Sequence, residues 1–424
     1  MSFEIIRDPL WNNIRLDEPT LRLVDTRVFQ RLRYVRQLGL AYLVYPGGTH
    51  TRFEHALGAY HLARITVALL AERGELSRVP EGEGAVVRAA ALLHDVGHYP
   101  FSHALEEIGA VHHEEVAGPL ITSGEVADVL RDAFGDDAPA RVLALIRGTS
   151  QSPLQGLISG SLDLDKIEYL KRDAIMCGVP YGEIDVDRLT NSLVLVDDPE
   201  SGRPTVGILE KGLSALESLL FAKYQMYRNV YWHHAVRSAT AMYKRLVDDA
   251  LAAASLDPRH LATFTDEGLL HQLSSAGAPL LAALRERRLY KRALECPAAE
   301  LGDGFAQWIA SDRALAVAVE DRLAEELGMA PGELLLDFPA KTQMLGLDIP
   351  VRRRGGEVHR LTAAGWEGTI NLPRLSEELY RSARWLRVFV AHRRTVPRAP
   401  VLEVLHRPPA ELRSAIAEGR ALIG

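Results

Sequence analysis

Apolar residues recur at helical spacing along most of this chain before residue 331. Residues 53–73 carry apolar side chains at intervals of three and four, which predicts a helix. Val86–Leu93 is almost wholly apolar, as expected of a short buried helix, and the helix breakers Gly97 and Pro100 follow it. Further helices are predicted over residues 21–38, 104–109, 113–121, 124–133, 139–147, 163–175, 276–288, 303–312 and 314–327, with one or two long helices over residues 210–254.

The pattern changes near Pro331, where short strand-like runs begin. Residues 352–356 (RRRGG) lie between two of these runs and have the composition of a hairpin turn. The predicted strands are Leu334–Phe338, Gln343–Val351, Glu357–Thr362 and Leu386–Ala391. We therefore expect a mainly α fold, with a helical body over residues 1–254 and a smaller mixed α/β part within residues 255–424.

The composition is that of a globular chain able to bury a full core. Of its 424 residues, 47% are hydrophobic and 25% are charged, which allows one large domain or two to three ordinary ones. A net charge of −7 argues against a protein that coats nucleic acid, since such proteins need a basic face. The three arginines at residues 352–354 then belong to a solvated turn or an interface.

Two cysteines, Cys177 and Cys296, provide neither a disulfide framework nor a paired-cysteine zinc site. The N-terminal residues MSFEIIRDPLWNN lack the basic stretch and apolar core of a secretion signal. Apolar runs stay shorter than the roughly 18 residues that a membrane helix needs. We therefore expect a soluble, cytoplasmic protein with no membrane partner.

Histidines are concentrated in one part of the chain. Eight of the fifteen lie within residues 50–113, and imidazole is the commonest protein ligand for transition metals. His94 and Asp95 directly follow an apolar run, so both should be buried, where unpaired polar groups are costly. A metal ion would satisfy both side chains at once. The eight are His50, His55, His61, His94, His98, His103, His112 and His113.

Two further residues complete a candidate ligand set. His55 lies on an earlier predicted helix, and Asp165 opens a later one, on which Asp165, Tyr169 and Asp173 form a polar stripe. Two histidines and two carboxylates suit manganese, iron, nickel, cobalt or magnesium, and a structural zinc less well. Such a metal lowers the pKa of bound water and draws charge from a phosphoryl oxygen. For any single histidine, a buried core position is the simpler interpretation.

Three segments carry a family resemblance, in order along the chain. They are FQRLRYVRQLGLAYLVYPGGTHTRFEHALG (residues 29–58), LLHDVGHYPFSH (92–103) and LDLDKIEYLKRD (162–173). Together they resemble the HD-domain deoxynucleoside triphosphate triphosphohydrolases, well over residues 1–240 and more loosely beyond. The resemblance implies an HD-domain helical fold that hydrolyses deoxynucleoside triphosphates to deoxynucleoside and inorganic triphosphate. It also implies a divalent transition metal (manganese, iron, nickel, cobalt or zinc), with magnesium accompanying the triphosphate.

The resemblance assigns roles to the clustered residues. Its metal ligands are His55, His94, Asp95 and Asp165. His103 matches the acid that protonates the leaving oxygen, and His98 lies with it beside the phosphates. His113 supports this acid, and Glu106 stands where close relatives carry aspartate, so its longer side chain puts the supporting hydrogen bond in question. The implied catalytic set is His98, His103, Glu106 and His113.

Eight residues match positions that hold the substrate. By resemblance, Gln37 and Leu38 contact sugar and base, whereas Tyr231 crowds the 2′ position and so selects deoxyribose. Tyr169 and Asp173 match groups that bind the 3′-hydroxyl. The remaining three match phosphate-binding positions: Arg52, Lys166 and Lys223.

Each of these matches has an ordinary alternative. Arg52 can simply pair with Glu54 or Asp95, and Lys166 lies on a helix, where lysine is common. Tyr231 can be a core aromatic residue. An arginine is usual at the position of Lys223, so Arg228 is a rival candidate for this phosphate-binding role.

The implied reaction is attack of an activated water on the α-phosphorus, with His103 as the general acid for the departing 5′ oxygen. The choice of the α-phosphorus rests on the resemblance alone. Residues 82–84 (GEG) lack the Lys-Ser/Thr pair of a phosphate-binding Walker loop. Ser102 beside His103 is not a nucleophile pair on adjacency alone.

The resemblance also implies a second nucleotide site. In animal members of the family, a guanine nucleotide binds at a subunit interface and promotes assembly. Asp25, Gln30 and Arg33 match residues that read guanine there, and Arg188 matches a phosphate contact. Glu4 is acidic where a base is expected, and charged helix faces are often simply solvated. The implied partners are therefore the substrate, a guanine nucleotide activator, and further copies of this chain in a dimer or tetramer.

Two other classes of function stay open. Another HD phosphohydrolase (a nucleoside monophosphatase, a cyclic-nucleotide phosphodiesterase or a nuclease) would use the same metal site with a different pocket. A non-catalytic nucleotide sensor need not keep all four metal ligands, so the intact set argues against it. Residues 255–424 carry no chemistry of their own in the sequence and are assigned to packing and assembly.

Overall fold

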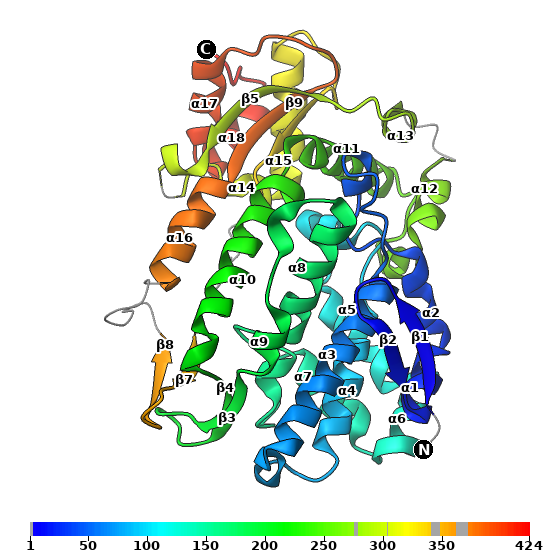
Figure 1. Ribbon diagram of the computed structural model, residues 1–424. Coiled ribbons are helices and arrows are strands. Elements are labelled where there is room, and N and C mark those ends of the chain that lie inside the picture. The colour runs from blue at the N-terminus through cyan, green and yellow to red at the C-terminus, as the bar shows by residue number, and fades with distance from the viewer. Residues whose placement is uncertain (1–2, 275–278, 303, 341–347, 362–371) are drawn as a thin grey trace.

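The computed structural model describes residues 3–274, 279–302, 304–340, 348–361 and 372–424. A large helical body carries a smaller lobe of sheet and helices at one end (Figure 1). This is the mainly α architecture with a mixed C-terminal part that the sequence predicts. In the described part of the chain, none of the helices combines the length and the apolar character needed to cross a membrane.

The helical body surrounds α3, the long helix predicted from the apolar spacing. Helices α4 and α8 both pack against α3, α7 packs against α4, and α10 packs against α8. The bounds are α1 (Glu18–Val24), α2 (Arg27–Gln30), α3 (Arg52–Glu72), α4 (Glu83–Leu93), α5 (His113–Thr122), α6 (Gly124–Phe134), α7 (Ala138–Ile146), α8 (Leu164–Cys177), α9 (Val186–Thr190), α10 (Leu213–Met226) and α11 (His234–Ala252).

The N-terminal residues differ from the sequence prediction. In place of one helix over residues 21–38, the chain forms α1, α2 and a 3-10 turn, and Thr26 starts α2 by accepting the N–H of Phe29. An unpredicted hairpin of β1 (Glu4–Asp8) and β2 (Asn12–Leu16) precedes them. The predicted helix over residues 104–109 is also wrong, because this segment forms only short 3-10 turns (Ser102–Ala104 and Glu106–Ile108).

A four-stranded sheet joins distant parts of the chain. Its order is β3-β4-β7-β8, with β4 and β7 parallel and the other pairs antiparallel. The predicted hairpin turn at residues 352–356 is confirmed, since β7 and β8 pair across it. The predicted strand over residues 343–351 is seen only from Ile349, and residues 341–347 lie outside the described part. The bounds are β3 (Leu193–Asp197), β4 (Pro204–Leu209), β7 (Ile349–Arg352) and β8 (Val358–Leu361).

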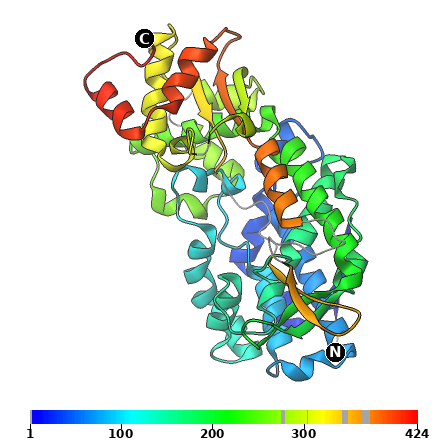
Figure 2. The same cartoon turned by 90° about the vertical axis from the view of Figure 1, so that its left-hand side faces the viewer.

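The C-terminal lobe is built on an antiparallel sheet of order β5-β9-β6. Helix α15 packs on β6, and β6 also contacts α11, so the lobe is attached to the body through this strand. Helix α16 runs beside α10 in both views (Figure 2). The bounds are α12 (Asp266–Ser274), α13 (Pro279–Arg285), β5 (Lys291–Pro297), α14 (Trp308–Ser311), α15 (Arg313–Glu326), β6 (Leu334–Asp337), α16 (Leu372–Ala383), β9 (Trp385–Val390), α17 (Arg398–His406) and α18 (Pro409–Ala417).

Candidate active site

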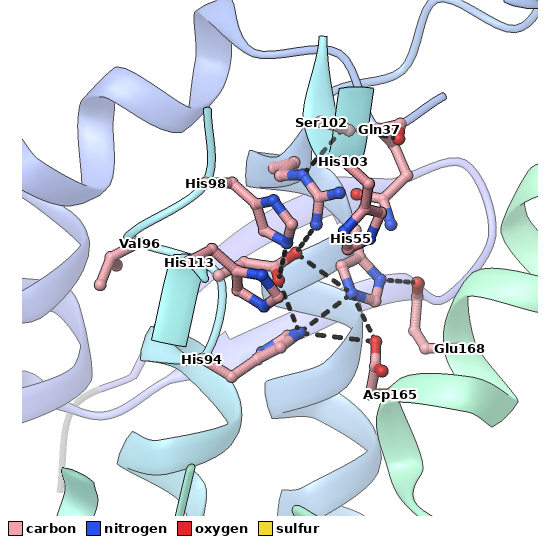
Figure 3. Close-up of polar contacts among 12 residues, drawn as sticks. Gln37, His55, His94, Val96, His98, Ser102, His103, His113, Asp165 and Glu168 are labelled. Carbon is pink, nitrogen blue, oxygen red and sulfur yellow. Dashed lines mark hydrogen bonds and ion pairs between the residues drawn. The ribbon is translucent and has the colours of Figure 1, made fainter. Parts of the chain in front are cut away.

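The four predicted metal ligands meet at one point, and Figure 3 labels three of them, His55, His94 and Asp165. Helix α3 supplies His55, the end of α4 supplies His94 and Asp95, and the first turn of α8 supplies Asp165. The Nε2 atom of His55 lies 3.2 Å from Nε2 of His94 and 3.0 Å from Oδ1 of Asp165. The carboxylate of Asp95 lies 3.6 Å from the same His55 nitrogen and 3.3 Å from Nε2 of His94. The structure therefore brings together the whole predicted ligand set.

Local sequence explains why α8 reaches the ligands on α3. A Cβ atom at Gly58 would lie 2.0 Å from Oε1 of Glu168, so only glycine leaves room for this side chain beside α3. Asp163 is the N-cap residue of α8, and its carboxylate accepts the N–H of Lys166 at 2.9 Å. This start places Asp165 in the first turn, where it faces His55.

Hydrogen bonds on the far side of each imidazole orient the two histidines. The Nδ1 atom of His94 lies 2.8 Å from the carbonyl oxygen of Ala91, and Nδ1 of His55 lies 2.6 Å from Oε2 of Glu168. Both oxygens accept, so each Nδ1 carries a hydrogen and each neutral ring has its lone pair on Nε2. Histidines that bind metals almost always have such a partner.

This donor set fits a divalent metal ion. Two ligand atoms that are each about 2.1 Å from one ion, at right angles to each other, lie about 3 Å apart. The two Nε2 atoms have this separation, and two carboxylates offset the positive charge. His55, His94 and Asp95 could therefore hold a metal ion, whose identity the donor set leaves open. Asp165, with Oδ1 lying 3.0 and 3.5 Å from the two imidazole nitrogens, could supply a fourth ligand.

The carboxylates change the protonation of both histidines. Burial by itself lowers the pKa of His55, but Asp165 and Glu168 outweigh it and raise this pKa to about 10. Burial is likewise outweighed at His94, whose pKa is raised by Asp95 and Asp165. Asp95 is also buried, yet Arg52 and the histidines hold its pKa well below the ordinary value. Without a metal, protons therefore balance the carboxylates at neutral pH.

We expect metal binding to release protons. Only an unprotonated imidazole nitrogen can bind the ion, so affinity should rise as the pH increases from 6.5 towards 10. The proton on His55 stabilises the metal-free protein fully below pH 6.5, and this contribution is lost as the pH rises through about 10. Titration calorimetry with manganese at neutral pH, in buffers of different ionisation enthalpy, measures the number of protons. A count of zero would contradict this account.

Glu168 should tune the metal affinity without touching the ion. It orients His55 and is itself held by Arg172 Nε at 2.7 Å and by Trp11 Nε1 at 2.9 Å. We expect Glu168→Gln to weaken metal binding about 10- to 100-fold, as measured by competition with a chelator dye. The matched control is Glu83→Gln on α4, which removes a buried carboxylate paired with Arg141 of α7. Equal metal affinity in the two variants would refute this role for Glu168.

A second group of imidazoles lies next to the ligands. The carboxylate of Glu106 spans two of them, with Oε2 lying 3.0 Å from Nδ1 of His103 and Oε1 lying 2.7 Å from Nδ1 of His113. The His113 ring stacks on His98 with ring centroids 3.7 Å apart. Glu106 is largely buried, yet the two histidines lower its pKa and keep it ionised. The longer side chain of glutamate therefore reaches both imidazoles at once.

Two of the three predicted phosphate-binding residues, Arg52 and Lys166, form ion pairs with nearby carboxylates. Arg52 donates to Asp95 at 2.5 Å and to Ser102 Oγ at 3.2 Å, whereas Glu54 caps α3 through Thr51. Lys166 pairs with Asp163 at the start of α8. Burial, helped by the nearby charge of Lys166, lowers the pKa of Lys223 to about 8. Its rival Arg228 is exposed and donates to the hydroxyl of Tyr224 at 2.6 Å.

Asp173 forms the centre of a buried polar group beside the ligands. Its two carboxylate oxygens lie 2.7 Å from Nε2 of His50 and 2.7 Å from the hydroxyl of Tyr231. The ring of Tyr169 lies between this group and the ligands, with its centroid 6.5 Å from Tyr231 and 6.4 Å from His55. Burial, together with Asp173, raises the pKa of Tyr231, so its hydroxyl stays protonated and donates.

Gln37 and Leu38 border the same region. The backbone oxygen of Gln37 accepts from Ser102 Oγ at 2.9 Å, and the side-chain oxygen of Gln37 is buried without a hydrogen-bond donor. Leu38 is partly buried beside Gly48. An unsatisfied buried acceptor is costly, so Gln37 Oε1 is available to a substrate group that donates a hydrogen bond.

The four residues of the predicted activator site do not come together in one chain. Gln30 donates to the Val24 carbonyl at 2.8 Å and accepts from Arg33 at 2.8 Å, close to the exposed Asp25. Arg188 lies on α9, which packs against α10 and α3 and is separated from α1 and α2 in Figure 1, and it donates to the Lys211 carbonyl at 2.9 Å. An activator site over all four residues would need a second copy of the chain, and it stays a prediction.

The sequence assigned no role to two residues that the structure places in the site. His50 belongs to the histidine concentration, but its contact with Asp173 joins segments 123 residues apart. Glu168 lies three residues after Asp165 and therefore on the same face of α8. That spacing could have pointed to Glu168, whereas only the crossing of α3 and α8 reveals its contact with His55.

Comparison with known proteins establishes the family. The HD domain matches residues 52–169, and the HD associated region matches residues 184–365. An uncharacterized protein of Methanocaldococcus jannaschii is 37% identical over 328 residues, which are 77% of this chain and 67% of that protein. The chain therefore belongs to the HD-domain phosphohydrolase family and carries the HD associated region.

Relatives with named activities are more distant or match a shorter segment. The deoxynucleoside triphosphate triphosphohydrolase SAMHD1 of Homo sapiens is 43% identical over 105 residues, covering 25% of this chain and 17% of that protein. Its homolog in Dictyostelium discoideum is 28% identical, covering 68% of this chain and 60% of that protein. Another uncharacterized relative, protein YwfO of Bacillus subtilis, is 36% identical to this chain, and the match spans 56% of its length.

Solved structures share the fold over nearly the whole chain. A hypothetical protein from Aquifex aeolicus has a TM-score of 0.69 at 28% identity. The match covers 92% of this chain and 97% of the Aquifex aeolicus chain. A phosphohydrolase from Bacteroides thetaiotaomicron has a TM-score of 0.72 and covers 92% of this chain and 100% of its own. At 23% identity, the second similarity supports the fold alone.

Proposed function

We propose that this chain hydrolyses deoxynucleoside triphosphates to deoxynucleoside and inorganic triphosphate. The observation that carries the proposal is the position of Tyr169 between the metal ligands and the Asp173 group. A nucleotide with its phosphates at the ligands would have its sugar beside Asp173 and Tyr231. The names of the SAMHD1 relatives support the same substrate class.

Basic residues around the ligands suit a polyanionic substrate. Arg52 and Lys223 are buried, and Lys166 lies at the first turn of α8. The pKa of about 8 leaves Lys223 mostly protonated at neutral pH, and a phosphate beside it would raise this pKa. The triphosphate would be held chiefly by charge, as phosphoryl transfer requires.

The chain's own residues supply the leaving-group proton. A bound divalent metal would lower the pKa of a water and neutralise charge on the phosphoryl oxygens. The His103 side chain is 60% exposed, so it is open to substrate, and Glu106 orients it. In the proposed step, the water oxygen bonds to the α-phosphorus, the bond from phosphorus to the 5′ oxygen breaks, and His103 protonates that oxygen.

Product analysis tests this proposal. The protein is incubated with each of four deoxynucleotides and four ribonucleotides, with manganese or magnesium, and the products are separated by anion exchange. We expect deoxynucleoside and intact triphosphate from deoxynucleotides, and neither from the His94→Ala/Asp95→Ala double variant. Release of phosphate or diphosphate would show that the reaction is a different one. Turnover of monophosphates or cyclic nucleotides alone would show that the substrate belongs to a different class. Metal binding without any turnover would indicate a nucleotide sensor.

A further inference from the structure

We propose that Glu107 is a positioning residue, whose ion pairs with Arg237 and Lys244 hold the segment bearing His103 and Glu106 in place. The inference rests on the proposed role of His103 as the acid. It extends that role to the C-terminal lobe, because the same ion cluster includes Asp337 on β6.

The segment before His103 is held in an unfavourable backbone conformation. Phe101 and Ser102 have φ values of 57° and 63°, in the left-handed region that side chains disfavour. Such residues persist only when their surroundings fix them. The N–H of Phe101 donates to Asp266 at 2.8 Å, and Ser102 Oγ donates to the Arg36 carbonyl at 2.8 Å. One end of the segment is therefore anchored to α12 and to the chain before α3.

Glu107 anchors the other end. Arg237 donates to both of its carboxylate oxygens, at 2.9 and 2.8 Å, and Lys244 donates to one of them at 2.9 Å. Both cations lie on α11. The neighbouring Glu106 turns the opposite way, towards His103 and His113. Two consecutive carboxylates thus join the imidazoles on one side to α11 on the other.

Most of the ion cluster is buried, and its cations and carboxylates contact each other directly. Arg237, Lys244 and Asp337 are 4%, 7% and 0% exposed. Arg237 also donates to Asp337 at 2.5 and 3.0 Å, so two cations face two carboxylates. Removing one member would leave an uncompensated buried charge. A bidentate pair between arginine and a carboxylate also fixes the relative orientation of the two side chains, which a lone surface ion pair does not.

The cluster gives the C-terminal lobe a part in the active site. Residues 102–108 contact α11 and α14, and Phe101, Ala104 and Leu105 lie in one apolar core with α11, Leu335 of β6 and Phe389 of β9. Asp337 lies two residues after Leu335 on β6 and completes the ion cluster. The lobe therefore supports the segment of His103 through both packing and charge.

The test compares Glu107→Gln with the matched control Glu320→Gln. Glu320 is also a buried carboxylate between two arginines, Arg313 at 3.2 Å and Arg245 at 3.4 Å, and it lies on α15. Its Oε1 also accepts the N–H of Leu336 on β6, a hydrogen bond that the side-chain oxygen of glutamine can keep. We expect Glu107→Gln to lower kcat about tenfold or more while KM and metal content stay unchanged. Hydrogen exchange of residues 101–110 should become faster in this variant, and Glu320→Gln should match the wild type in all four measurements.

A less disruptive variant keeps the proposal testable if Glu107→Gln does not fold. Lys244→Met removes one of three hydrogen bonds to Glu107 and should lower kcat by an intermediate factor. Wild-type kcat and exchange in Glu107→Gln would overturn the proposal, as would an equal loss in Glu320→Gln. A wild-type protein without activity on deoxynucleotides would instead overturn the proposed function, and the exchange measurement would still decide whether Glu107 anchors the segment.

Discussion

Replacing His94 with asparagine should remove the bound metal and lower kcat/KM by at least about 1,000-fold. The variant loses one of two imidazole nitrogens that face each other at 3.2 Å, and with it the charge stabilisation that a metal provides. That stabilisation is worth several kcal/mol, and each 1.36 kcal/mol corresponds to about a tenfold change in rate. Elemental analysis of the purified protein and steady-state kinetics measure the two effects.

His61→Asn is the matched control for this substitution. His61 is also a buried histidine on α3, but its ring packs against Trp11 at 5.7 Å, outside the ligand set. This control should keep metal and activity, with at most a loss of stability. If His94→Asn kept a full complement of metal and wild-type turnover, the assignment of His94 as a ligand would be wrong.

Asp173→Asn should lower kcat/KM for a deoxynucleoside triphosphate by about 10- to 100-fold. The carboxylate accepts hydrogen bonds from His50 and Tyr231, and it is the group proposed to hold the 3′-hydroxyl of the substrate. Hydrogen bonds to a charged partner contribute about 1.5–3 kcal/mol, which corresponds to this range. The loss should appear in steady-state kinetics at saturating metal.

The substrate itself offers the control for this prediction. A 2′,3′-dideoxynucleotide lacks the 3′-hydroxyl, so the wild type should prefer the deoxynucleotide, and Asp173→Asn should lose most of that preference. An equal drop for both substrates would show that Asp173 supports the fold and does not contact the sugar. Thermal unfolding of the variant measures any loss of stability separately.

The helices that carry the metal ligands were predictable because their patterns are local. The apolar spacing of residues 53–73 predicts α3 nearly to the residue, and the apolar run before His94 predicts α4. The motif LDLDKIEYLKRD places Asp165 at the start of α8. A ligand set spread over three such helices can be read from the chain because each helix presents its ligand at a recognisable motif.

Apart from the β7-β8 hairpin, the strand pairings were not predictable in the same way. In β1, Ile5 is exposed, so the alternation that marks a half-buried strand is missing. Strands β4 and β7 pair although Ile208 and its partner Val351 lie 143 residues apart in the sequence. Such a contact depends on how the body closes, which no local pattern contains.

Buried partners of the functional residues were the hardest to foresee. Glu107 is one of two adjacent glutamates, and the family resemblance singles out only Glu106, which stands where close relatives carry aspartate. Its partners Arg237 and Lys244 lie 130 and 137 residues further along the chain. Charged residues on a helix are usually solvated, so Arg237 stands out only once its burial is known.

The most direct test of the central claim is hydrolysis in water enriched in oxygen-18, with the products weighed by mass spectrometry. Attack on the α-phosphorus predicts one heavy oxygen in the inorganic triphosphate and none in the deoxynucleoside, in a reaction that requires metal and intact His94. Any other labelled product would reveal a different reaction: heavy oxygen in a nucleoside monophosphate means that diphosphate leaves the α-phosphorus, and heavy oxygen in diphosphate or single phosphate means attack on the β- or γ-phosphorus. That result would contradict the triphosphohydrolase account of this HD-domain protein.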